Sequence, residues 1–288
     1  KRMRWILIFW LGYAACMGRP AEPVQRETVV ADSVVPKINP SGTTIETRFP
    51  VPVGFVRMPT DSGTFGAYLR CLPLLPDGEP VLLYNGRKKN RQDVHCAVID
   101  IDVGSRDLQQ CADAVMRLRA EYLYAQRRFD NIHFNFSNGF RADYARWRKG
   151  ERIRVDGNRV YWVAGQNPAE SRAGFQAYLD MVFAYAGSAS LERELTVADI
   201  TNIRPGDIWI EGGYPGHAVI VVDVAVHPES GERQFLLAQS YMPAQQIHIL
   251  RNPGDAEKCP WYSMEGLEGG LVTPEWSFDS DRLRRFPS

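Results

Sequence analysis

The stretch "RPGDIWIEGGYPGHAVIVVD", residues 204–223, contains two segments that predict neighbouring β-strands. The first follows the turn Pro205-Gly206-Asp207. The second opens on Gly216-His217 and continues as an uninterrupted apolar run, which is typical of a strand buried on both faces. An imidazole at the entrance of such a strand is either a buried residue with one hydrogen bond or a functional group. Residues elsewhere in the chain are needed to choose between these interpretations.

The segments on either side extend this prediction to an α+β fold. Residues 233–242, "RQFLLAQSYM", predict an antiparallel neighbour across a short polar loop. Residues 105–129 carry apolar residues at steps of three and four, which predicts an amphipathic helix with Asp107 or Ser105 as its N-cap and Cys111 in its first or second turn.

The remaining segments predict shorter elements around this helix and sheet. We expect an irregular edge strand over 47–59, a hairpin over 81–103 that turns at Asn85-Gly86, and a basic solvated turn over 86–91. Within an insertion at about 130–200, we expect a short helix over 141–148, a hairpin turning at 156–158 and a helix over 171–196. One α+β domain over 46–288 is the simplest organisation.

The first residues predict export rather than a fold. Three basic residues precede about eleven apolar or small residues and then Ala14-Ala15-Cys16, a pattern typical of a signal peptide. The small pair before Cys16 resembles a bacterial lipobox, although Tyr13 replaces the usual leucine. This predicts lipidation of Cys16, with plain secretion as the alternative. Residues 17–45 then predict a flexible tether, and the protein is expected in the cell envelope on a lipid anchor.

Charge and cysteine usage limit the classes of partner and cofactor. The chain has 34 basic and 34 acidic residues, so no net field favours nucleic acid. A bridge between Cys71 and Cys96 is compatible with an oxidising compartment. The five histidines are dispersed without the spacing of zinc ligands, and we expect no metal and no cofactor.

Cys111 and His217 together predict nucleophilic catalysis. A cysteine near a helix N-terminus is favoured as a thiolate by the positive end of the helix dipole. A histidine at the start of a neighbouring strand can accept the thiol proton and return it to a leaving amine. Each residue also has a simpler interpretation, because a free cysteine is often buried as a small hydrophobic residue. The pairing therefore requires helix and sheet to bring both side chains together.

Here the sequence resembles two families of papain-like cysteine hydrolases, the NlpC-type and CHAP-type amidases and peptidases. The similarity lies in "PGDIW" (205–209), "GHAVIV" (216–221) and the dipeptide Gln110-Cys111. It implies a papain-like antiparallel sheet with an N-proximal catalytic helix, Cys111 as nucleophile, His217 as base, and cleavage of peptidoglycan. Taken whole, residues 45–285 also resemble an uncharacterised family of Bacteroidota envelope proteins, through "QQCADAVMRLRAEYLY", "PGHAVIVVD" and "LLAQSYMPAQ".

The third residue of such a site must come from a neighbouring strand. Asp223 is excluded as the partner of His217, because six residues along a strand span about 20 Å. Gln239 on the adjacent strand is the best candidate for orienting the ring, with Ser240 or Tyr241 as alternatives if the register differs.

Substrate contacts are expected around this triad. The backbone N–H of Cys111 and the side chain of Gln110 are candidates for an oxyanion hole. Gly213 would let a substrate backbone approach, and Trp209 and Tyr214 offer aromatic surfaces.

The sequence thus predicts a membrane-tethered cysteine hydrolase acting on an amide bond, with peptidoglycan or a peptide as substrate. Two alternatives stay open. The first is a catalytically inactive envelope lipoprotein that uses the cleft to bind a wall fragment or a partner protein. The second is a purely structural cell-surface protein. The 217 − 111 = 106 residues from Cys111 to His217 exceed what compact hydrolases use, so the insertion is either a recognition subdomain or a lid over the cleft.

Overall fold

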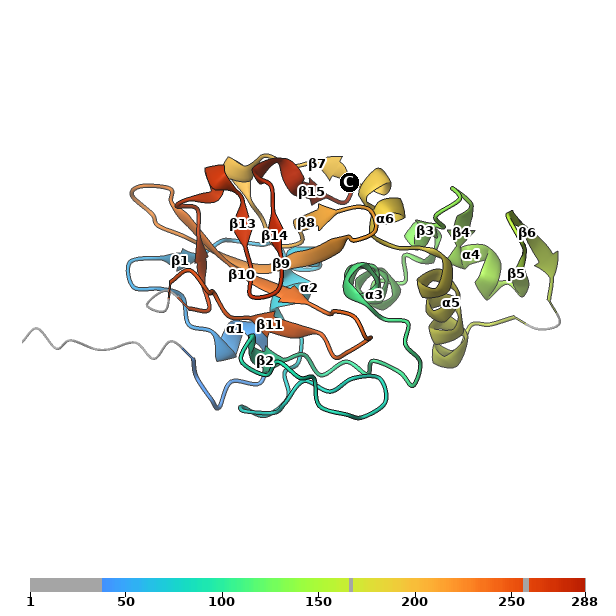
Figure 1. Ribbon diagram of the computed structural model, residues 1–288, viewed down its shortest axis with the longest axis horizontal. Coiled ribbons are helices and arrows are strands. Elements are labelled where there is room, and N and C mark those ends of the chain that lie inside the picture. Colours follow the sequence, from blue (N-terminus) through green and yellow to red (C-terminus); the bar gives the residue numbers. More distant parts are fainter. Residues whose placement is uncertain (1–37, 166–167, 256–258, 288) are drawn as a thin grey trace, which may run out of the picture. The chain divides into compact units, whose positions relative to one another are not determined.

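The strand β9 (His217–Val226) occupies the middle of an antiparallel sheet in the computed structural model, which describes residues 38–165, 168–255 and 259–287 (Figure 1). The predicted signal peptide, Cys16 and most of the tether lie outside these residues. Nine strands of the described chain form this sheet, and every pair is antiparallel. Its main path runs β2 (His95–Val98), β11 (His248–Leu250), β10 (Arg233–Gln239), β9, β8 (Ile208–Glu211), β15 (Leu283–Arg285) and β7 (Thr196–Val197), while β1 (Val56–Arg57) pairs with β9 and β12 (Tyr262–Ser263) with β10.

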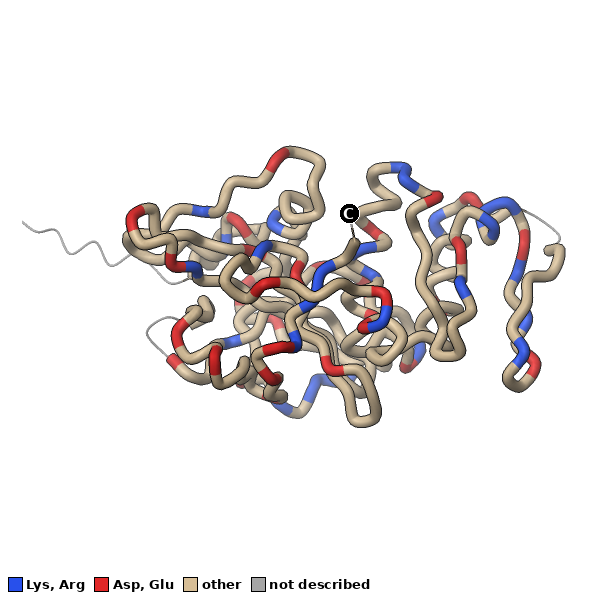
Figure 2. The backbone as a smooth tube through the Cα atoms, turned by 90° about the horizontal axis from the view of Figure 1, so that it is seen from above, with Lys and Arg blue, Asp and Glu red and all other residues tan. Residues whose placement is uncertain are grey.

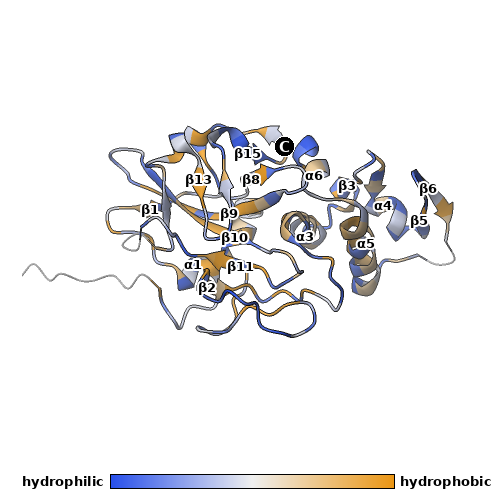
Figure 3. Cartoon of the chain, viewed as in Figure 1, coloured by the Kyte–Doolittle hydropathy of each residue, from blue (hydrophilic) through white to orange (hydrophobic). Residues whose placement is uncertain are grey.

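The sheet is buried on both faces, as the apolar run of β9 predicts. Side chains alternate between the two faces of a strand, so β8 and β9 contribute to two apolar clusters. The first contains Ile208, Ile210, Ala218 and Ile220 together with helix α3 (Cys111–Ala125). The second contains Trp209, Val219, Val221 and Phe278, on the opposite face. Figure 3 shows the hydrophobic character of β9.

Helix α3 confirms the predicted amphipathic helix but is shorter than expected. It begins at Cys111, and its N-cap is Gln110 rather than Asp107 or Ser105. The reason is tertiary: Asp107 Oδ1 accepts a hydrogen bond from the N–H of Ala244 at 2.7 Å. This bond holds the preceding segment against the sheet, so α3 starts only where Asp113 Oδ2 accepts from the N–H of Gln110 at 3.1 Å.

The segments before α3 contain less regular structure than predicted. The expected strand over 47–59 is reduced to β1, and α1 (Ile45–Arg48) precedes it. In the expected hairpin over 81–103 only β2 is a regular strand, although the turn at Asn85-Gly86 is present and closed by a bridge between Leu82 and Lys88. The prediction of a solvated turn over 86–91 is wrong for Lys89, of which only 8% is exposed. A further helix, α2 (Phe65–Arg70), contacts β9.

The insertion contains the predicted elements with one change. The helix expected over 141–148 is α4 (Tyr144–Arg148), and the hairpin turning at 156–158 is formed by β5 (Glu151–Asp156) and β6 (Arg159–Ala164). The helix expected over 171–196 is divided at Gly187, where the Oγ of Ser190 accepts from the glycine N–H and caps a new helix. The other elements are η1 (Phe129–Asn131), β3 (His133–Asn135), β4 (Arg141–Asp143), α5 (Arg172–Tyr185) and α6 (Ser188–Glu194).

Short segments, most of them C-terminal, cover the second face of the sheet. They comprise η2 (Ile200–Asn202), η3 (Leu267–Gly269), β13 (Leu271–Val272), β14 (Ser277–Phe278) and η4 (Ser280–Arg282). Acidic and basic residues are interspersed along the described chain, as Figure 2 shows. Asp223 is fully buried and pairs with Arg57 and Arg70, so it supports the sheet and is not available to His217.

Candidate functional site

The N-terminus of α3 is fixed to the end of the sheet where β9 begins and β10 ends. The hydroxyl of Ser240, which follows β10, lies between two carbonyl acceptors, the backbone oxygens of Gln109 at 3.0 Å and Gln245 at 2.8 Å. Together with the bond between Asp107 and Ala244, this contact joins the start of α3 to the segment that leaves β10. The helix also packs against β9. Cys111 and His217 are therefore carried to the same end of the sheet, although 106 residues separate them (217 − 111).

Cys111 is partly buried beside the first residues of β9. The N–H groups of Ala112, Ala218 and Cys111 itself face the sulfur and favour the thiolate, and Ala218 is the residue after His217. Burial outweighs these groups and raises the pKa of Cys111 to about 11, and the carboxyl of Asp113 acts in the same direction. In the ligand-free protein the sulfur therefore carries its proton at neutral pH.

His217 forms the contact with Gln239 that the strand pattern predicts. Its Nε2 lies 2.9 Å from Oε1 of Gln239, and both residues are about 1% exposed. The imidazole is enclosed by aromatic rings, with centroids of Tyr241 at 4.8 Å and Trp276 at 5.3 Å. Burial lowers the pKa of His217 to about 4, because the hydrogen bond to Gln239 compensates only partly for desolvation and the charge of Lys89 lowers the pKa further.

Gln239 is held in turn by groups that the sequence did not reveal. Its Nε2 donates to Oε2 of Glu275 at 2.8 Å and lies 3.4 Å from Nε2 of the buried His248. The other oxygen of Glu275 accepts from Nζ of Lys89 at 2.7 Å. We call the set His217, Gln239, Glu275 and Lys89 the histidine network. Lys89 stood in a basic run interpreted as a solvated turn, and Glu275 had no sequence signal.

The network determines which nitrogen of His217 carries the proton. A carboxylate can only accept, so Glu275 requires the NH2 group of Gln239 on its side. Oε1 of Gln239 then faces the imidazole and must accept from Nε2–H of His217. The neutral ring therefore has its lone pair on Nδ1, which is the nitrogen a general base would use. His248 is consistent with this orientation of Gln239. Its Nδ1 donates to the backbone oxygen of Gln246 at 2.9 Å, so its Nε2 can accept from the NH2 group of Gln239.

The structure does not bring the thiol and the imidazole into hydrogen-bond contact. Alternation along β9 places the ring of His217 with Val219 on the second face, whereas α3 covers the first. Among the described residues, no hydrogen bond joins Sγ of Cys111 to His217. The structure brings Cys111 close to β9 only through the N–H of Ala218, the residue after His217.

Gln110 does not face the thiol as an oxyanion donor. Its Nε2 donates to Oδ1 of Asp107 at 3.2 Å, at the surface. The neighbouring Gln109 is the buried glutamine of the pair, since it is 1% exposed and its Oε1 accepts from Arg117. The N–H of Cys111 belongs to the first turn of α3, whose N–H groups have no partner within the helix.

The three other predicted substrate contacts have different environments. Tyr214 is 96% exposed and free to contact a ligand. The glycines before His217 accommodate α6 rather than a substrate: Gly213 donates to Oγ of Ser188, and a Cβ at Gly212 would overlap the carboxylate of Glu192. The expectation for Trp209 is wrong, because its side chain is fully buried in the second cluster and has no surface to offer.

A cavity of about 420 Å³ opens beside the histidine network. It shares Lys89, Tyr241 and Glu275 with the surroundings of His217, and Arg87 and Met242 lie on its wall. Neither Cys111 nor His217 lines this cavity, so a ligand in it would contact the network at Lys89 and Glu275.

Within residues 38–165, 168–255 and 259–287, no group of three His, Cys, Asp or Glu side chains could hold a metal ion. Across the same residues, every helix is too short or too polar to cross a bilayer. Cys71, Cys96, Cys111 and Cys259 are all unpaired thiols in the structure.

A protein-family model described as a domain of unknown function (4846) matches residues 45–285. This confirms the expectation of an uncharacterised family over those residues. No curated protein and no solved structure matches the chain.

Proposed function

The chain belongs to the family of the domain of unknown function 4846, and from its site we propose that it is a papain-like cysteine hydrolase that cleaves an amide bond, with peptidoglycan as the substrate class. The observation that carries the proposal is the fixed tautomer of His217. Its Nε2–H is donated to Gln239, so its Nδ1 is free to accept a proton at the strand end that also holds Cys111. We further propose that Cys16 anchors the protein by a lipid in the cell envelope.

In the proposed reaction, substrate enters beside Tyr241 through the cavity that borders the network. Bound substrate must first bring Cys111 and His217 together, because the two groups are not in hydrogen-bond contact in the ligand-free protein. Nδ1 of His217 then takes the thiol proton, and the sulfur attacks the carbonyl carbon. The N–H of Cys111 stabilises the oxyanion, as first-turn N–H groups of a helix can. His217 then gives the proton to the leaving amine, and water cleaves the thioester to release the acid and restore the thiol.

In the proposed enzyme, the histidine network orients the imidazole, a role that a directly bound carboxylate could also fill. Gln239 orients the ring, and Glu275 orients Gln239 through its NH2 group. The negative charge of Glu275 is one residue removed from the imidazole and is already paired with Lys89. His217 should therefore be a weaker base than a histidine that contacts a carboxylate directly.

We expect Cys111→Ala to abolish the release of soluble muropeptides from purified peptidoglycan, because it removes the sulfur that would attack the amide carbonyl. The measurement is chromatography with mass spectrometry of the products. The matched control is Cys71→Ala, which removes an exposed thiol at the end of α2 and should cleave like the wild type. Equal cleavage by Cys111→Ala and wild type would refute the enzymatic proposal.

One observation favours the alternative of a catalytically inactive protein that binds a wall fragment in the same cleft. With the pKa of Cys111 at about 11 and that of His217 at about 4, the thiolate and imidazolium are both unfavourable without a ligand. At neutral pH roughly one Cys111 in ten thousand would be a thiolate.

Alkylation of Cys111 by iodoacetamide tests this alternative directly. A rate that rises about tenfold per pH unit towards pH 11 is expected for the free protein, because only the thiolate reacts. If the protein is an enzyme, a bound substrate should bring the sulfur and the imidazole together. The alkylation rate of Cys111 at neutral pH should then rise. If a muropeptide that binds the protein leaves the alkylation rate of Cys111 unchanged or lower, the binding function is favoured.

A further inference from the structure

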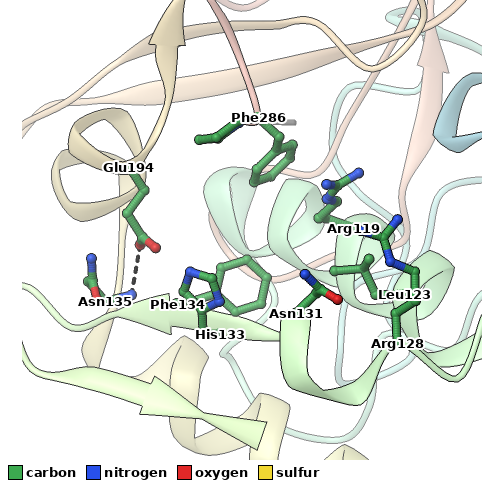
Figure 4. A pocket seen from close by; sticks show the side chains of 10 residues that line it. Arg119, Leu123, Arg128, Asn131, His133, Phe134, Asn135, Glu194 and Phe286 are labelled. Atoms are coloured by element: carbon green, nitrogen blue, oxygen red, sulfur yellow. Dashed lines mark hydrogen bonds between the residues drawn. The ribbon is translucent and has the colours of Figure 1, made fainter.

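A second cavity, of about 300 Å³, lies along the C-terminal half of α3 and is separate from the candidate catalytic site (Figure 4). Arg119 lines it eight residues after Cys111, which corresponds to about 12 Å along the helix. The other walls come from η1, β3, α6 and the C-terminal segment. The cavity therefore lies between the insertion, α3 and the residues after β15.

One side of this cavity carries two positive charges without a counter-charge. Arg119 and Arg128 both line it, and Figure 4 shows their guanidinium groups on the same side. Among the described residues, neither guanidinium has a carboxylate partner. Burial lowers the pKa of Arg119, and the neighbouring charge of Arg128 acts in the same direction. Two adjacent cations, one of them partly desolvated, form a site that an oxyanion would stabilise.

Arg119 is held in position by aromatic rings rather than by an acid. Its Cζ lies 5.0 Å from the ring centroid of Phe286, 5.2 Å from that of Phe65 and 5.5 Å from that of Tyr122. These contacts fix the planar group while its N–H donors stay available. A fixed guanidinium loses little further freedom when a carboxylate binds.

The opposite side of the cavity offers an acceptor. Oε1 of Glu194 accepts from the N–H of Asn135 at 2.7 Å, and Figure 4 shows its carboxyl across the cavity from the two arginines. Burial raises the pKa of Glu194 to about 7, although the N–H of Asn135 and the charge of Arg141 oppose this. A ligand ammonium would supply the close cation that this carboxyl lacks.

The centre of the cavity is apolar, with one further polar atom. Phe134 is 2% exposed and forms part of the wall with Phe286. Nδ1 of His133 is buried and has no partner within the described chain. A ligand that reaches from the arginines to Glu194 would cross this aromatic surface and could bond to the imidazole.

We propose that this cavity binds a zwitterionic amino acid or dipeptide, with its carboxylate on Arg119 and Arg128 and its ammonium group on Glu194. The cavity volume is at the lower limit for small-molecule sites, which suits a ligand of this size. The cavity shares no residue with the histidine network, so the proposal does not depend on the proposed hydrolase activity.

The test is isothermal titration calorimetry of the full chain with alanyl-alanine. Saturable binding is expected, and Arg128→Ala should weaken it about tenfold or more, because a charged hydrogen-bonding partner is lost. Arg128 is exposed, so this variant should fold normally. Arg154→Ala is the matched control, since it removes an exposed arginine of β5 outside the cavity and should bind like the wild type.

Capped peptides separate the two ends of the ligand. Alanyl-alanine amide lacks the carboxylate and should not bind. N-acetyl-alanyl-alanine lacks the ammonium and should bind about tenfold more weakly to the wild type, with no further loss in Glu194→Gln. Cys111→Ala should bind alanyl-alanine normally, whatever its effect on hydrolysis.

The proposal is overturned if alanyl-alanine shows no saturable binding at millimolar concentration or binds equally to Arg128→Ala. Saturable binding of inorganic phosphate alone, lost in Arg128→Ala, would also overturn it, because the site would then recognise a phosphate and not an amino acid.

Discussion

The two ends of α3 differ in how their polar groups are satisfied. Near the N-terminal end, the side chains from His217 to Lys89 are joined by hydrogen bonds and an ion pair, which leave Nδ1 of His217 open. Along the C-terminal half, Arg119 and Arg128 line a cavity, and in the described chain no carboxylate pairs with either guanidinium. A completed network fixes one proton position, whereas uncompensated charge favours the binding of an opposite charge. The first arrangement suits chemistry on a positioned group and the second suits binding.

The largest stability effect is expected from breaking the completed network. Lys89→Met leaves Glu275, whose side chain is 10% exposed, without its cation. Removing one partner of such a buried pair should lower the free energy of unfolding by about 3 kcal/mol. Urea denaturation measures the loss.

A nearby exposed pair provides the control for Lys89→Met. Arg91 pairs with Asp93 two residues further along, but both side chains are more than half exposed. Arg91→Met should leave the urea midpoint unchanged, because exposed ion pairs contribute little. If the two variants lose equal stability, Lys89 is not part of a buried network.

A smaller effect is expected from the pH dependence of the two buried histidines. The pKa is about 4 for His217 and about 3 for His248, against an ordinary value of 6.5, chiefly because both are buried. As the pH falls below 6.5, the unfolded chain binds protons that the folded protein does not. Stability is therefore lost, by up to about 1.4 kcal/mol per pH unit for each histidine, until the pH passes the folded pKa.

Comparing wild type with His248→Asn isolates this contribution. Between about pH 6.5 and pH 5, the free energy of unfolding should fall less steeply in the variant than in the wild type. The difference should be up to about 1.4 kcal/mol per pH unit. Asp113 and Glu194, whose pKa values burial raises, act in the opposite direction in both proteins and cancel in the difference. Equal slopes would show that folding does not lower the pKa of His248.

The smallest stability effect is expected at the cavity of Arg119. Arg128→Ala should change the free energy of unfolding by less than about 0.5 kcal/mol, because the guanidinium is exposed and has no partner to lose. Thermal and urea unfolding measure this. A loss as large as that of Lys89→Met would mean that Arg128 is structural, and the contrast between the two ends of α3 would disappear.

The sequence predicted the central fold because its apolar pattern is strong there. The antiparallel pairing of β9 and β10 follows from two apolar runs joined by a short loop, and α3 and α5 follow from their apolar stripes. Prediction failed where local pattern is weak. Trp209 was expected to face a ligand, but alternation along β8 directs it into the second cluster.

The candidate site was predictable only through the residues that β-strand register brings together. His217 and Gln239 lie diagonally opposite on β9 and β10, so an alignment of the two strands is enough to find them. Glu275 and Lys89 come from irregular segments, and neither has a periodic pattern that points to the site.

Composition and periodicity by themselves determined an α+β chain with a buried antiparallel pair, a helix that carries Cys111, and a histidine at a strand entrance. Local patterns suffice for this because burial places apolar residues on one face of an element. In a helix they recur once per turn, and in a strand they recur at alternate residues. Tertiary structure alone decided which face His217 occupies, which groups hold its proton on Nε2, and that Arg119 and Arg128 share a cavity with Glu194. These depend on contacts between segments far apart in the chain, whose positions are fixed only when the whole core is packed.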